Sequence, residues 1–196
     1  MLAIDKAAAD LLFLEAHTAD RFTSDPVSDA QIEEIWDLVR WAPTSGNSSP
    51  ARLLLVRTPE ARERLAGHMS QSNREKTLAA PLTVVSAADT RYHDLWPTIA
   101  PHRVEAAARL EDDPERRLAL ATTGALLQTA YFIIGVRAAG LAAGPMGGFN
   151  SAGVDGEFFA DGRWRSLLVI NIGVPAQDGS RTRLPRFAFA DVARSV

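Results

Sequence analysis

Apolar residues recur at helical spacing early in the chain. The positions that form this apolar face are Ile32, Ile35, Trp36 and Val39. Ser28 precedes them as a good N-cap, and Gln31 three residues later completes a capping-box pattern. The pattern predicts a helix over residues 28–41. Thr58-Pro59-Glu60 indicates the start of another helix, because proline in the first turn loses no hydrogen bond.

A longer helix is expected over residues 113–139. Asp113-Pro114-Glu115 is a strong helix start, and Gly140 is a suitable terminator. Residues 125–136 are apolar almost all round, and a single domain of this size can rarely surround such a helix. We therefore expect part of the helix to face a second subunit. Residues 118–136 also lack charge and approach bilayer thickness, but threonines and a central glutamine favour a helix buried in protein over a membrane span.

Three short apolar runs predict strands over residues 52–57, 82–88 and 167–172. Between the second strand and the long helix, residues 89–113 are broken by Trp96-Pro97 and Ala100-Pro101. This region predicts a mobile helical excursion over the surface, either a substrate lid or surface decoration. Helices and strands alternate without a steady βαβ rhythm, which indicates an α+β fold rather than a doubly wound sheet.

Composition narrows the class of protein. A length of 196 residues with 46% hydrophobic residues fits a single domain over residues 1–196. The net charge of −3 does not favour nucleic acid or an anionic membrane as a partner. The absence of cysteine excludes disulfides and thiolate chemistry, and the four histidines lack metal-ligand spacing, so we expect no metal. The first residues do not have the order of a signal peptide, which makes the cytoplasm the expected location.

The most informative segment spans residues 41–52, between the first helix and the first strand. Its small polar residues lie between Pro43 and Pro50, and they are Thr44, Ser45, Asn47, Ser48 and Ser49. A helix-capping turn needs about two such residues. Five of them on a loop fixed at both ends by proline suit a rigid array of donors for the oxygen atoms of a ligand. The sequence contains neither a Rossmann phosphate-binding turn nor a P-loop.

Three further segments hold candidate chemistry. Asn73 and Lys76 share a helix face, although such a pair is usually a solvated surface. Residues 140–149 contain four glycines, of which a helix end explains only Gly140 well. Near the carboxyl end lie Arg181, Arg183 and Arg186, which form either a basic surface segment or a phosphate site.

Together these segments resemble the nitroreductase superfamily. Ala-Pro-Thr-Ser-x-Asn-x-Ser-Pro-Ala-Arg and Gly-Pro-Met-x-Gly-Phe are similar to the subgroup of malonic semialdehyde reductases and NADH dehydrogenase/NAD(P)H nitroreductases. The resemblance implies a mixed, mainly antiparallel sheet flanked by helices, a long helix at a homodimer interface, and FMN as the cofactor. The residues that it implies for binding FMN are Thr18, Arg21, Pro43, Thr44, Ser45, Asn47, Asn73, Lys76, Gly144, Pro145, Met146, Gly147, Gly148, Arg181 and Arg183.

The resemblance also assigns roles. Asn73 and Lys76 would lie beside the flavin pyrimidine, the glycine loop beside N5, and Arg181 and Arg183 at the phosphate, while residues 43–47 would come from the neighbouring subunit. NADH or NADPH would donate hydride in a ping-pong reaction, and the small-molecule acceptor could be a nitro compound, a quinone or a short aldehyde such as malonic semialdehyde. No side chain is implied as a catalytic acid.

The N-terminal block departs from the family pattern. His17 stands where arginine is usual in the subgroup, and Asp20 stands where lysine, arginine or asparagine is expected. An aspartate near a phosphate is repulsive unless it is screened or turned away. Two alternatives to the enzyme therefore stay open at the level of sequence: a non-catalytic flavin- or nucleotide-binding dimer, and a structural dimer with an empty cleft.

Overall fold

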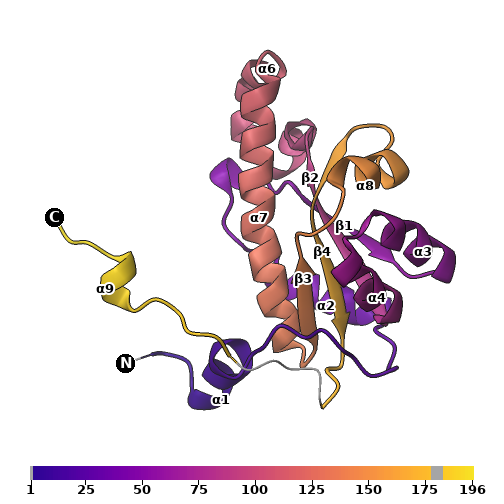
Figure 1. Cartoon of the computed structure of the whole chain (residues 1–196). Helices are drawn as coiled ribbons and strands as arrows, with labels where there is room; N and C mark the ends of the chain where they lie inside the picture. Colours follow the sequence, from indigo (N-terminus) through magenta and orange to yellow (C-terminus); the bar gives the residue numbers. More distant parts are fainter. Residues whose placement is uncertain (1, 178–182) are drawn as a thin grey trace.

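The centre of the molecule is an antiparallel sheet (Figure 1), seen in a computed structural model that describes residues 2–177 and 183–196. Its strands are β1 (Ala51–Val56), β2 (Leu82–Asp89), β3 (Ala142–Met146) and β4 (Trp164–Gly173). They lie in the order β1-β2-β4-β3, and each neighbouring pair is antiparallel. The predicted α+β class is confirmed, and each predicted strand lies within β1, β2 or β4 to about one residue.

Strand β3 was not predicted. From the sequence we expected a loop over residues 140–149, because glycine and proline, here Gly144 and Pro145, are both rare inside strands. The sheet order places β3 at an edge, where only one side of the strand must supply ladder hydrogen bonds and proline is tolerated. Edge position therefore explains why a glycine–proline sequence forms a strand here.

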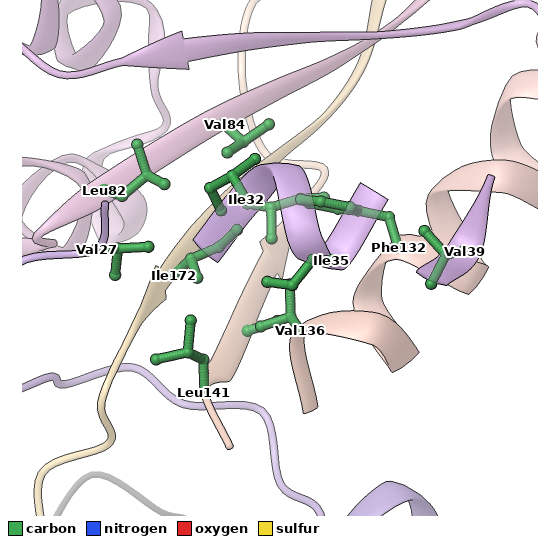
Figure 2. Close-up of a cluster of buried hydrophobic side chains, with 12 residues drawn as sticks. Val27, Ile32, Ile35, Val39, Leu82, Val84, Phe132, Val136, Leu141 and Ile172 are labelled. Atoms are coloured by element: carbon green, nitrogen blue, oxygen red, sulfur yellow. The ribbon is translucent and has the colours of Figure 1, made fainter. Parts of the chain in front are cut away.

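Both faces of the sheet are buried, which accounts for the continuous apolar runs. Along β2, Val84 packs into one cluster and Val85 into another, because successive side chains of a strand point to opposite faces. The first cluster lies under α2 (Asp29–Val39) and α7 (Pro114–Ala138) (Figure 2). The second lies under α3 (Pro59–His68) and α8 (Ser151–Phe158). Helix α4 (Gln71–Ala79) packs beside α3.

Local signals set where the helices begin. Ser28 and Gln31 form the predicted capping box of α2, although the helix ends at Val39 rather than at residue 41. The Thr58 side chain caps α3, with Pro59 in the first turn. Asp113 caps α7 by accepting from the backbone N–H of Arg116, and Gly140, just beyond the end of that helix, has a φ of 73°. Helix α8, capped by Asn150, was not anticipated.

Helix α7 is half-buried in a single chain. Its inner side packs on the sheet and is tied by polar contacts: Gln128 Oε1 accepts from the N–H of Ala51 at 3.0 Å, and the Thr129 and Ser86 hydroxyls lie 2.5 Å apart. Its outer side leaves Leu126, Leu127 and Tyr131 more than 40% exposed. By length and composition α7 passes the test for a membrane span, but the helices that line soluble cores pass it too, and its buried side holds these polar contacts.

Residues between β2 and α7 are helical, as expected, but they do not merely cross the surface. They form η3 (Tyr92–Leu95), α5 (Trp96–Ile99), η4 (Pro101–Arg103) and α6 (Val104–Glu111). Tyr92, Trp96 and Leu110 are buried and pack against the amino-terminal half of α7. The expectation of a surface excursion was wrong, because these apolar side chains complete a third core cluster.

The two ends of the chain reach away from the sheet on the same side of the molecule (Figure 1). The amino-terminal end holds α1 (Lys6–Ala9) and the π-helical turn η1 (Asp10–Leu14), and the carboxyl end holds α9 (Phe189–Val192). Phe187 and Phe189 are each 83% exposed. Large exposed apolar groups of this kind usually mark a surface that another chain covers.

Candidate functional site

A cavity of about 520 Å³ opens beside the carboxyl end of α7, between α4, β3 and the segments at both ends of the chain. This volume lies within the range of roughly 300–1,000 Å³ that small-molecule and cofactor sites occupy. The residues that line it are Phe13, Ala16, His17, Thr18, Ala19, Asp20, Asn73, Lys76, Arg137, Gly144, Pro145, Met146, Asn171, Arg183, Leu184 and Arg186.

One end of the cavity is strongly basic. Arg183 Nη2 donates to the carbonyl oxygens of Leu14 and Ala16, the latter at 3.0 Å, and Arg137 Nη1 donates to the carbonyl of Leu12 at 2.9 Å. Burial, and then the charge of Arg183, lower the pKa of the Arg137 guanidinium. Two neighbouring cations that repel one another are stabilised by an anion between them, so this end fits a phosphate group.

The side of the cavity formed by α4 presents an amide and an ammonium group. Asn73 and Lys76 are three residues apart and share a helix face, as the sequence predicted. Asn73 Nδ2 donates to the carbonyl oxygen of Gly148 at 3.1 Å, which fixes the side chain against the loop after β3. A polar ligand ring on this side would meet both a hydrogen-bonding amide and a positive charge.

The predicted glycine segment reaches the cavity through Gly144, Pro145 and Met146, while Gly147 and Gly148 follow immediately outside it. Close packing explains two of these glycines. A Cβ at Gly144 would lie 2.4 Å from the carbonyl oxygen of Ala19. A Cβ at Gly148 would lie 2.9 Å from the Asn73 amide nitrogen. Glycine at both positions therefore allows close packing of the backbone in and around the cavity wall.

The polar loop of residues 43–47 lies elsewhere. It contains the turn η2 (Ser45–Asn47), in which Gly46 and Asn47 adopt the left-handed backbone conformation, with φ values of 60° and 53°. Asn47 Nδ2 donates to the carbonyl of Ile99 at 2.7 Å. Just beyond the loop, Pro50 lies against Gly124 of α7, thirteen residues and about 20 Å along the helix from Arg137. Pro43, Thr44, Ser45 and Asn47 therefore do not reach this chain's own cavity.

Another predicted residue, Arg21, does not line the cavity either. The carbonyl oxygen of Arg21 accepts from the N–H of Ala176 at 3.2 Å, and Arg21 is absent from the cavity wall that the structure describes. Arg181 lies outside the described residues. Thr18 and Arg183 do reach the cavity.

Arg137 and Asn171 line the cavity but were not predicted. Arg137 ends an apolar helix, where a basic residue is ordinary, so its position gave no signal. Asn171 was the one amide inside an apolar strand. It is 2% exposed, and its Oδ1 accepts from the Thr83 hydroxyl at 2.8 Å. A polar residue in a buried strand is the signal that could have been followed.

A second polar cluster lies beside α6. His93 Nε2 is 2.8 Å from Glu111 Oε1, and the ligating atoms of His93, Asp94 and Glu111 lie within 4.8 Å of one another. Arginines already neutralise these carboxylates, since Arg91 pairs with both of them and Arg117 pairs with Glu111. This arrangement is an ion-pair network rather than a metal centre.

Comparisons with known proteins identify the family that has this fold. The model of the nitroreductase family matches residues 17–174. A Streptomyces coelicolor protein named a putative NADH dehydrogenase/NAD(P)H nitroreductase is 49% identical over 195 residues, covering 100% of this chain and 99% of the relative. A Streptomyces griseus protein of the same name is 48% identical over the same length, with the same coverage. The chain belongs to the nitroreductase family.

Solved structures agree on the fold. A nitroreductase family protein from Streptococcus pneumoniae superposes with a TM-score of 0.81 at 20% identity, covering 94% of this chain and 100% of the other. A protein from Exiguobacterium sibiricum, crystallised in complex with FMN, gives 0.83 at 18% identity, covering 100% and 99%. The family consists of oxidoreductases that use FMN with NAD(P)H, so the enzyme class and cofactors expected from the sequence are confirmed.

Proposed function

We propose that two copies of this chain form an FMN-dependent enzyme that passes hydride from NAD(P)H to a small acceptor in the cytoplasm. The observation that supports this most directly is the shape and charge of the cavity. Arg137 and Arg183 are held by backbone carbonyls of residues 12–16, whereas Asn73 and Lys76 line the cavity from α4. This separation matches a ligand with a phosphate at one end and a polar ring at the other.

The chain's own residues bind and orient the cofactor. Arg137 and Arg183 place two guanidinium groups for the phosphate, where charge-assisted hydrogen bonds are strongest. Lys76 supplies a positive charge along the ring side, and such a charge stabilises the more negative, reduced state of a ring beside it. Bound FMN supplies the hydride-transferring ring, and donor and acceptor would use the same face in turn, giving ping-pong kinetics.

A second subunit would complete the site. Pro50, just beyond the loop of residues 43–47, packs against Gly124 of α7, close to where that helix exposes Leu126 and Leu127. Burying this apolar stripe against a symmetric copy would place the partner's Thr44, the partner's Ser45 and the partner's Asn47 at this chain's cavity. The same association would cover the exposed phenylalanines near the carboxyl end.

The acceptor is a nitro compound, a quinone or a short aldehyde such as malonic semialdehyde. Each accepts a hydride from a reduced ring without requiring a metal. Names of relatives favour the first, since the Streptomyces proteins are named for NAD(P)H nitroreductase activity.

Visible absorption tests the proposal. The purified protein, reconstituted with FMN, is expected to be yellow and to bleach when NADPH or NADH is added anaerobically, then to regain colour when an acceptor is added. A yellow protein that never bleaches would indicate a non-catalytic flavin binder instead. A protein that stays colourless in excess FMN would contradict both, and would leave a structural dimer.

A further inference from the structure

A second, smaller cavity lies at the opposite end of α7. It has a volume of about 180 Å³ and is enclosed by the helical segment of residues 92–110 and the amino-terminal half of α7. Its polar lining consists mainly of Ser45, Ser48, Trp96, Arg103, Arg109 and Arg116. Arg116 and Arg137 are separated by 21 residues of α7, or about 32 Å, so this cavity is distinct from the large one in the same chain.

The cavity is positively charged. Within the described chain its wall holds three arginines and no carboxylate, and none of these arginines forms an ion pair there. Two acidic side chains of the adjoining segment are engaged elsewhere: Glu111 with Arg91, His93 and Arg117, and Asp113 with the backbone of α7. Arg103 is half-buried, and Arg109 and Arg116 are exposed at the rim of the cavity. Several guanidinium groups around one cavity without a carboxylate on its wall suit the binding of an oxyanion.

Trp96, one of the residues that line the cavity, has a side-chain N–H without a hydrogen-bond partner in the described chain. Trp96 is 2% exposed, and its indole N–H is buried without an acceptor in the part of the chain that the structure describes. The Arg103 guanidinium lies 5.2 Å from the centre of the Trp96 ring, within the range of a cation–π contact. Burial raises the pKa of the neighbouring Tyr92 hydroxyl, while the charges of Arg103, Arg117 and Arg116 oppose that rise.

We infer that this cavity binds a small oxyanion, the carboxylate or phosphate group of a ligand, between Arg103, Arg109 and Arg116. Guanidinium groups and the two serine hydroxyls are the donors that such a group would meet in the cavity. The volume admits a carboxylate or phosphate group with a short tail rather than a whole nucleotide.

The position of Ser45 links this site to the reaction, a step that rests on the proposed function. Ser45 belongs to the loop that the dimer would deliver to the partner's large cavity, so the oxyanion site would lie beside the partner's flavin. It would then hold either the carboxylate of an acidic acceptor or the 2′-phosphate of NADPH. Both are oxyanions of the same binding chemistry.

Binding can be measured without turnover. Protein labelled with ¹⁵N at its tryptophans, loaded with FMN to fill the large cavity, is titrated with inorganic phosphate and with malonate. Trp96→Phe assigns the Trp96 indole signal. We expect that signal to shift saturably, with affinity reduced roughly ten-fold in Arg109→Gln and in Arg116→Gln, as for one lost charge-assisted contact. Arg64→Gln, on the surface of α3, is the matched control and should bind normally.

Absence of a saturable shift, or unchanged affinity in both variants, overturns the site. Should the protein fail to take up FMN, the same titration on the flavin-free protein, with Arg183→Gln to remove anion binding in the large cavity, still decides it. The proposed function and this inference can therefore fail separately.

Kinetics distinguish the two sources of the oxyanion. If an acidic acceptor uses the site, Arg109→Gln raises KM for 4-nitrobenzoate about ten-fold and leaves KM for the neutral 4-nitrobenzyl alcohol unchanged. If NADPH uses it, the variant raises KM for NADPH and not for NADH. The link to the reaction would be overturned if Arg109→Gln changed KM equally for the two nitro compounds and equally for NADPH and NADH. It would also be overturned if the variant changed none of these KM values.

Discussion

Lys76 pairs with Asp20 at the wall of the large cavity, with Nζ 3.9 Å from Oδ2. The aspartate is one of two residues that depart from the family pattern, and a basic residue or asparagine is usual at its position. Because both side chains are partly buried, at 31% and 21% exposure, their charges are only partly screened by water. Asp20 therefore competes with a bound anion for the Lys76 charge.

Replacing Asp20 with asparagine should strengthen the binding of FMN. The change removes a negative charge from a cavity that holds an anionic ligand, and it releases Lys76. A gain of about 1 kcal/mol, or roughly five-fold in Kd, is expected for a partly exposed pair. Quenching of FMN fluorescence measures it. Asp37→Asn removes an exposed carboxylate that pairs with Arg40, away from the cavity, and should bind FMN as the wild type does. Weaker binding by Asp20→Asn would contradict this account.

Replacing Arg183 with alanine should weaken FMN binding by roughly ten- to a hundred-fold, the effect of losing a hydrogen bond to a charged group. Arg183 also supports the carbonyls of Leu14 and Ala16. Arg183→Lys, which keeps the charge, should restore part of the affinity if the charge matters. Retention of wild-type affinity by the alanine variant would rule out the phosphate role of this residue.

Gly144→Ala should destabilise the protein by about 1–3 kcal/mol, since the new Cβ would lie 2.4 Å from the backbone oxygen of Ala19. Chemical denaturation followed by circular dichroism measures the free energy of unfolding. The matched control is Gly147→Ala, three residues further on, where nothing lies within 4 Å of an added Cβ. Equal stability of the two variants would show that Ala19 moves aside.

Leu127→Glu should break the proposed dimer. Leu127 is 45% exposed on the outer side of α7, and a charge there cannot be buried against a second copy without a large penalty. Light scattering after size exclusion should report a monomer, and FMN binding should fall with it because the partner's loop is lost. Leu78→Glu, at an exposed leucine of α4, should remain dimeric. If the Leu127→Glu variant remained dimeric, the dimer interface would have to lie on a surface that does not include Leu127.

Lowering the pH should remove the contribution of Glu111 to the free energy of unfolding. Hydrogen bonds first from Arg91 and then from His93 lower the pKa of the Glu111 carboxyl from 4.5 to about 2. A lowered folded-state pKa adds stability above the unfolded-state value, and that stability is lost as the pH falls from about 4.5 towards 2. Glu111→Gln should therefore lose stability at neutral pH and show a shallower decline over this range. Glu105→Gln, in the first turn of the same helix, should keep the wild-type slope.

The sequence alone determined the starts of α2, α3 and α7, three of the four described strands and the family resemblance. These features are local: a capping box, a proline in a first turn or an apolar run acts over a few residues. It failed at β3, where Gly144 and Pro145 fit only because that strand lies at an edge. It also failed for residues 92–110, whose aromatic side chains are buried only because α7 lies beside them.

The tertiary structure decided which candidate residues meet. Thr18, Lys76, Gly144 and Arg183 come from four distant segments, and strand pairing together with the folded-back ends of the chain gathers them around one cavity. The same packing keeps Thr44 and Asn47 out of it, brings Arg137 and Asn171 in, and collects Arg103, Arg109 and Arg116 around a second cavity. Periodicity and propensity act between neighbours in sequence, whereas these proximities depend on contacts that form only once the whole chain has packed.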